Sequence, residues 1–247
     1  MKTVTLIAIS LATCSAFGQF NSSKANLVTS RTSKLQFGVN FSPDICYRTL
    51  VNSDGSQSSE MIKTFRDTIE APKFGFTAGL NANYQIKKNW SIEAGIHYSN
   101  KGFQTQKKYL IFVDPNQPVP DPQYHVKFVD NFHCIDIPLK LNYTRGNQKL
   151  RFIGSVGLTS NILVQHKQNM FIYYSGRTDK QDSPNQFDYN TFNISPTFSA
   201  GVDYQIKQGG SLRIEPSFRY NMLNFIDAPL SGRLYSIGLN LGYYWGS

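Results

Sequence analysis

Ten residues in the first half of the chain alternate between apolar and polar side chains: Trp90-Ser91-Ile92-Glu93-Ala94-Gly95-Ile96-His97-Tyr98-Ser99. Successive side chains of a β-strand point to opposite faces, so a period of two predicts a strand with one apolar and one polar face. A surface helix would repeat its apolar residues every three to four positions instead. The stretch is therefore predicted to lie between two different environments.

The same alternation recurs along the chain. We count eight segments with this period, at residues 35–45, 74–86, 90–99, 135–144, 150–163, 193–206, 211–222 and 235–243. Their apolar faces carry Ile, Leu, Phe and Tyr, and their polar faces are rich in Gly, Ser, Asn and Thr. The segments predict an all-β fold.

The connections between these segments alternate in length. Residues 87–89, 145–148 and 207–210 have the length and composition of hairpin turns, whereas 48–73, 102–132 and 164–190 are long and polar. Prolines at 114–122 favour an extended loop. The pattern predicts an eight-stranded antiparallel up-and-down transmembrane β-barrel with short periplasmic turns and long extracellular loops.

The direction of the apolar face separates a membrane barrel from a soluble one. A lipocalin-like barrel would line a lipid-binding cavity with its apolar face, and an outer-membrane barrel would turn that face toward lipid. Three features favour the cell outer membrane: the polar face has few charges, aromatic residues gather near the strand ends, and the chain ends on an aromatic strand with Tyr243-Tyr244-Trp245.

The N-terminus has the features of an export signal. A basic start, an apolar run from Val4 to Ala12 and small residues before Gln19 predict a signal peptide at 1–18. A lipobox-like stretch ending at Cys14 leaves lipidation as the alternative. We expect a periplasmic segment at 19–34 and the barrel domain at 35–247.

Charge and cysteine content limit the function further. The net charge of +9 comes without a basic run interleaved with aromatic residues, so we expect no nucleic-acid partner. Cys46 and Cys134 lie on strands three apart in the predicted barrel. Because a disulfide requires Cα atoms within about 7 Å, we expect free thiols, with a bridge as the alternative.

Four stretches resemble the Bacteroidota outer-membrane barrel family named after PorT. They are Gly75-Phe76-Thr77-Ala78-Gly79-Leu80, the run from Glu93 to Gly102, Ile135-Asp136-Ile137-Pro138-Leu139-Lys140-Leu141, and Gly238-Leu239-Asn240-Leu241-Gly242-Tyr243. The resemblance covers most of residues 35–245 and implies an eight-stranded outer-membrane barrel. The namesake is tied to protein export by the type IX route, a role that the barrel pattern alone does not transfer to this chain.

The predicted inward face carries a nearly balanced set of charges. Its members are Asp44, Glu93, His97, Lys101, Asp136, Lys140, Arg151, Asp203, Arg213, Glu215 and Arg219. Eight strands leave a lumen barely wide enough for side chains, and unpaired charges there are costly. We expect a filled, non-conducting lumen, with a selective ion path as the alternative. We also expect Arg213, Glu215 and Arg219 to pair across neighbouring strands with partners such as Asp203.

The sequence gives little support for catalysis. His97 could be oriented beside Glu93, but no nucleophile motif accompanies it, and His125, His133 and His166 lack metal-ligand spacing. We expect no enzymatic activity, no metal and no cofactor, with a small outer-membrane barrel enzyme as the less favoured alternative.

The long loops carry aromatic residues suited to binding. The candidate contacts are Tyr109, Phe112, Tyr124, Phe171, Tyr173 and Tyr174, and packing among the loops is their alternative role. We expect a monomeric barrel that acts as a structural, binding or secretion-associated envelope component. Its expected partners are outer-membrane lipids and an envelope or secretion-system protein.

Basic residues gather at or beside the short turns. They are Lys34, Lys87, Lys88, Arg145, Lys149, Arg151 and Lys207. They suggest contact with anionic phospholipid headgroups or with an acidic periplasmic partner, and simple solubility of the turns is the alternative.

Overall fold

The computed structural model describes residues 34–110, 124–147, 149–174, 176–183, 188–206 and 210–246. The expected signal peptide at 1–18, nearly all of the segment at 19–34 and the proline-rich run at 114–122 lie outside the described residues.

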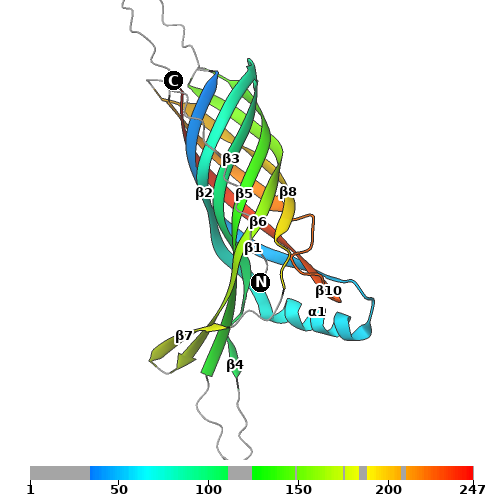
Figure 1. Ribbon diagram of the computed structural model, residues 1–247. Coiled ribbons are helices and arrows are strands. Elements are labelled where there is room, and N and C mark those ends of the chain that lie inside the picture. Colours follow the sequence, from blue (N-terminus) through cyan, green and yellow to red (C-terminus); the bar gives the residue numbers. More distant parts are fainter. Residues whose placement is uncertain are drawn as a thin grey trace, which may run out of the picture. The chain divides into compact units, whose positions relative to one another are not determined.

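Eight antiparallel strands close into a ring (Figure 1). Each strand pairs with a neighbour on both sides, and the last strand pairs with the first. In order around the ring they are β1 (Leu35–Asn52), β2 (Glu70–Lys87), β3 (Trp90–Thr105), β5 (Tyr124–Gly146), β6 (Leu150–Tyr174), β8 (Phe192–Gln205), β9 (Gly210–Tyr220) and β10 (Leu230–Gly246). The predicted up-and-down barrel is confirmed.

The alternation of side chains fixes which face of each strand points outward. Ile96 on β3 is 65% exposed and Leu80 on β2 is 63% exposed, whereas Glu93 and Asp136 are at most 1% exposed. The apolar residues thus form the outer surface, as lipid contact requires, and the polar residues fill the interior. A lipocalin-like apolar cavity is contradicted by this arrangement.

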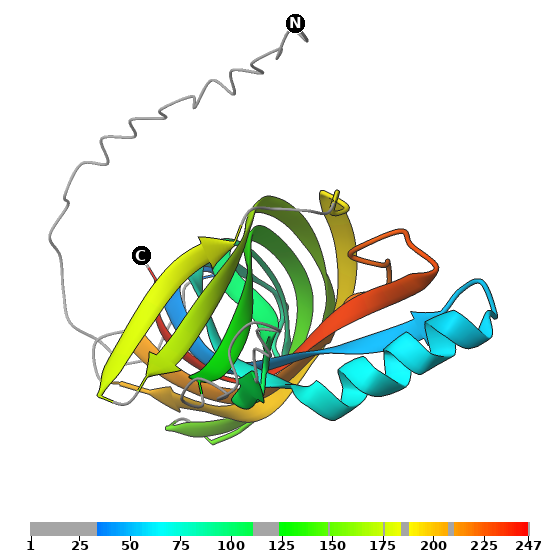
Figure 2. The same ribbon diagram turned by 90° about the horizontal axis from the view of Figure 1, so that it is seen from below.

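The two ends of the barrel differ in their connections. We call the end with the short β2–β3, β5–β6 and β8–β9 connections the turn end, and the opposite end the loop end. Figure 2 shows the ring from the loop end. Outer-membrane barrels keep their short turns in the periplasm, so the loop end faces the cell exterior.

The long connections contain more regular structure than the sequence predicts. The expected loop at 48–73 holds the end of β1, the helix α1 (Gln57–Ile69) and the start of β2. The expected loops at 102–132 and 164–190 hold long extensions of β5 and β6 and the short strands β4 (Lys108–Leu110) and β7 (Arg177–Ser183). Together β4, β5, β6 and β7 form a sheet that projects from the loop end (Figure 1). Both faces of such a sheet lie outside the bilayer, so the contrast between faces that reveals the membrane strands is lost.

Helix α1 packs against the barrel through its polar side. Ser56 caps its N-terminus by accepting a hydrogen bond from the backbone N–H of Ser59. The buried guanidinium of Arg48 on β1 pairs with Asp67 and, at 2.7 Å, with Glu70. Met61, Ile62 and Phe65 on the other side are more than half exposed. Within the part of the chain described here, no helix is long and apolar enough to cross a membrane.

We predict that Arg48→Met releases α1 while the barrel stays folded. Removing one partner of a buried ion pair costs about 3–5 kcal/mol. Because the Asp67 carboxylate is 45% exposed, the free-energy loss is smaller than for a fully buried pair. We expect it to appear as roughly tenfold faster amide exchange across α1. Hydrogen exchange followed by mass spectrometry measures this.

The matched control is Lys63→Met, which removes only the partly exposed pairs of Lys63 with Glu60 and Asp67. It should leave exchange in α1 nearly unchanged. Equal exchange rates in the two variants would contradict the anchoring role of Arg48.

Candidate functional site

The centre of the lumen is organised around one carboxylate. Glu93 on β3 is fully buried and pairs with Lys140 Nζ on β5 at 2.5 Å and with Arg213 Nη1 on β9 at 2.8 Å. Tyr244 Oη and Asn142 Nδ2 also donate to Glu93 Oε2, at 3.1 and 3.3 Å. The network therefore spans the lumen and joins four strands.

Tyr244 is a residue of the lumen network that the sequence analysis did not identify. The sequence places Tyr243 and Trp245 of the aromatic C-terminal strand at the membrane interface, and both are exposed on the outer surface. Tyr244 between them is fully buried, with the guanidinium of Arg213 3.9 Å from its ring centre. The alternation of side chains could have predicted this position, because Tyr244 follows Asn240 by four residues and therefore points to the same, inward face of the strand.

A second ion pair lies on the loop-end side of this centre. Arg219 Nη1 on β9 pairs with Asp44 Oδ2 on β1 at 3.1 Å. Thr77 and Ser42 donate to the same carboxylate, at 2.6 and 2.7 Å. Gly238 on the intervening strand β10 makes this possible, since a Cβ there would lie 1.8 Å from Asp44 Oδ1. A third pair joins Lys101 to Asp136 at 2.9 Å.

The expected pairing of lumen charges is partly wrong. Arg213 does approach Asp203 on the neighbouring strand, but at 3.8 Å, and Asp203 pairs mainly with Arg151. The close partners of Arg213 and Arg219 come from strands farther around the ring, because long side chains reach across so narrow a lumen. Glu215 accepts hydrogen bonds from Ser155 and Ser199 instead of an arginine.

His97 is a buried lumen residue whose hydrogen-bond partner is not Glu93. Its Nε2 lies 2.7 Å from Asn81 Oδ1. Within the described residues, no group of three or more His, Cys, Asp or Glu side chains could hold a metal ion. Cys46 and Cys134 are both buried free thiols.

The lumen side chains leave little empty space. The cavity bounded by His97, Asp136 and Arg219 measures about 20 Å³, which accommodates about one water molecule. The polar side chains around this cavity are therefore closely packed.

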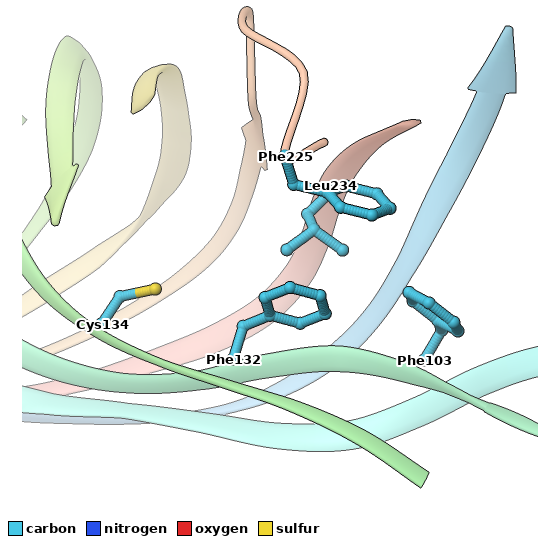
Figure 3. Close-up of a cluster of buried hydrophobic side chains, with 5 residues drawn as sticks. All are labelled: Phe103, Phe132, Cys134, Phe225 and Leu234. Atoms are coloured by element: carbon cyan, nitrogen blue, oxygen red, sulfur yellow. The ribbon is translucent and has the colours of Figure 1, made fainter. Parts of the chain in front are cut away.

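A cluster of buried hydrophobic side chains lies inside the barrel at the loop end (Figure 3). Phe132 on β5 lies 5.4 Å, between ring centres, from Phe225 of the β9–β10 connection, and Phe103 on β3 lies 6.1 Å from the same ring. Tyr189 contacts Phe132 edge-on, and burial raises the pKa of its phenol to about 12. We call this group, completed by Leu234, the mouth cap.

The candidate loop contacts that the structure describes lie on the projecting sheet. Phe171, Tyr173 and Tyr174 are half-buried residues of β6, and Lys107 Nζ lies 4.0 Å from the ring centre of Tyr173. Tyr109 and Tyr124 are described only as backbone, in β4 and at the start of β5, and Phe112 lies outside the described residues. Their role in binding stays a prediction.

The closed ring, lipid-facing apolar surface and polar lumen define a transmembrane β-barrel protein. The chain belongs to the outer membrane protein beta-barrel domain family, whose model matches residues 17–228. It is a protein of the outer membrane.

Several solved structures are similar to this chain. They include Neisserial surface protein A (13% identity, covering 87% of this chain and 98% of that chain, TM-score 0.42), OprG from Pseudomonas aeruginosa (11%, 87% and 98%, 0.44) and the outer membrane protease OmpT from Escherichia coli (8%, 87% and 97%, 0.42). No curated protein matches the sequence. Identities this low carry no argument about activity.

We predict that Glu93→Gln destabilises the barrel by about 3–5 kcal/mol, because Lys140 and Arg213 then share a buried site without their carboxylate. Denaturant unfolding in detergent, followed by heat-modifiable gel mobility, measures the change. The control Glu60→Gln alters an exposed carboxylate on α1 and should shift stability by less than about 0.5 kcal/mol. If the two variants unfold at the same denaturant concentration, the network does not stabilise the barrel.

Proposed function

We propose that this protein is a non-conducting outer-membrane barrel that acts through its loop-end surface as a structural, binding or secretion-associated component of the envelope. The observation that carries this proposal is the filled lumen, in which buried charges are paired across the barrel. A channel needs a continuous wet path, and the Glu93 network and the mouth cap both oppose one.

The loop end offers the surface on which binding would take place. The β4–β7 sheet and α1 project from a rigid barrel, an arrangement in which recognition segments are held by a stable scaffold. The sheet carries Phe171, Tyr173 and Tyr174, and α1 exposes Met61 and Phe65. Aromatic residues are enriched where proteins contact one another.

The finer assignments are also proposals. We propose a signal peptide at 1–18, a monomeric barrel in contact with outer-membrane lipids, and no enzymatic activity or cofactor. The resemblance of the β3 and β5 sequences to the PorT-named family is to the barrel pattern alone, so the secretion-associated role depends on the crosslinking experiment described below. The hydrogen bond from His97 to Asn81, in place of a contact with Glu93, supports a structural role for that histidine.

We predict that the purified protein shows no steady ion conductance in planar bilayers. Phe132→Ala, which opens only the mouth cap, should also stay closed because the charged lumen side chains beneath it remain packed. Steady conductance steps from the unmodified protein would contradict a filled lumen. Steps from the variant alone would show that the mouth cap, and not the charge network, closes the barrel.

We predict that a photo-crosslinking residue at Tyr174, in intact cells, captures an envelope protein. The matched control position is Phe152, which is 68% exposed on the lipid-facing surface, and it should capture lipid only. Identifying the captured protein as part of a secretion machinery would support the PorT-like role, and any other envelope protein would count against it. The same adducts from both positions would contradict a binding surface at the loop end.

A further inference from the structure

Five basic side chains form an exposed arc at the turn end of the barrel. We call this arc the basic collar, and its members are Lys34, Lys87, Lys88, Arg145 and Lys149. We propose that the basic collar binds the anionic headgroups of phospholipids in the periplasmic leaflet of the outer membrane. This inference goes beyond the proposed function, because it does not depend on what the loop end binds.

The basic collar lies at the level where headgroups are expected. Lys87 pairs in register with Trp90 across the β2–β3 turn, and the Trp90 ring lies 4.9 Å from the ring of Tyr143 on β5. Arg145 follows Tyr143 by two residues and so continues the same face of the strand. Outward-facing Trp and Tyr mark the interface between hydrocarbon and water in membrane barrels. The cations directly beyond them are therefore placed beside lipid phosphates.

Within the described residues, no exposed acidic side chain lies among the turns and strand ends that carry the basic collar. In the described residues of the turn end, the one nearby carboxylate is Asp203, which is fully buried and pairs with Arg151. No ion pair of a collar residue is found in the described parts of the chain. At the loop end, by contrast, exposed cations pair with acids, as Arg177 does with Asp179 at 2.7 Å.

Two of the basic residues counted from the sequence are not part of the basic collar. Arg151 lies on the inward face, as the alternation of β6 predicts, and pairs with the buried Asp203. Lys207 lies outside the described residues.

The distribution of the cations favours lipid over an acidic protein. Lys34 directly precedes β1, Lys87 ends β2 and Lys88 follows it in the β2–β3 turn. Arg145 lies at the end of β5 and Lys149 directly precedes β6. The strands β1, β2, β3, β5 and β6 are consecutive around the ring. The collar residues form an arc along the barrel circumference instead of one compact facet. A protein partner would need a continuous patch of about 800 Å², whereas headgroups are small and line the circumference of any inserted barrel.

The test compares two triple variants with the same loss of charge. In K87Q/K88Q/R145Q the cations are removed from the turn end, and in the control K167Q/R177Q/K180Q they are removed from the loop end. Each full-length protein is reconstituted with equal amounts of phosphatidylglycerol and phosphatidylcholine, and native mass spectrometry counts the lipids retained. Heat-modifiable gel mobility confirms that each variant is folded.

We expect the unmodified protein and the loop-end control to retain phosphatidylglycerol preferentially. In the turn-end variant, the ratio of retained phosphatidylglycerol to phosphatidylcholine should fall roughly tenfold, because each cation near an anionic surface contributes to binding. Equal retention of the two lipids by the unmodified protein overturns the proposal, as does an equal loss in both variants. A turn-end variant that keeps its lipid preference but loses a crosslinked periplasmic protein would overturn it in favour of an acidic partner.

A salt series on the unmodified protein gives a readout that does not depend on any variant folding. Raising the ionic strength from about 0.01 M to about 1 M shortens the screening length from about 30 Å to about 3 Å. The preference for phosphatidylglycerol should fall over this range. A preference that is insensitive to salt would overturn an electrostatic basic collar.

Discussion

In a bilayer, the backbone itself sets the first requirement on the structure, because hydrocarbon offers no partner for an N–H or C=O group. The pairing of β10 with β1 meets this requirement by closing the sheet. Closure also fixes the radius, and with eight strands the interior is only wide enough for side chains. The apolar outer surface and the crowded polar lumen both follow from that one constraint.

A narrow polar lumen buries charged side chains, and each of them needs partners of opposite charge or hydrogen-bond donors and acceptors. Each buried carboxylate has several donors: Glu93 accepts from two cations, a tyrosine and an amide, and Asp44 from an arginine and two hydroxyls. Such dense pairing holds charges in a low-dielectric space without leaving them uncompensated. It also leaves little empty space between the lumen side chains around His97 and Arg219.

The sequence was most informative where the two faces of a strand meet different environments. Alternation around Ile96 and Glu93 predicted the membrane part of every strand, but it could not show α1 or the extensions of β5 and β6, whose faces both lie outside lipid. Parity placed Arg213 and Arg219 inside the barrel without naming their partners, because these depend on which strands face each other across the ring. The inward turn of Tyr244 followed the same parity but was obscured by the aromatic residues beside it.

The geometry of the Glu93 network bears on how the barrel assembles. Its donors sit on β5, β9 and β10, far apart along the chain, so no single hairpin can reproduce it. Lys140 reaches Glu93 from the adjacent strand β5. Arg213 on β9 and Tyr244 on β10 reach it only when β10 has paired with β1 and closed the ring. The full pairing of Glu93 and the closure of the ring therefore occur together. A chain in which β10 has not yet paired keeps the free-energy cost of a Glu93 carboxylate that lacks part of its donors.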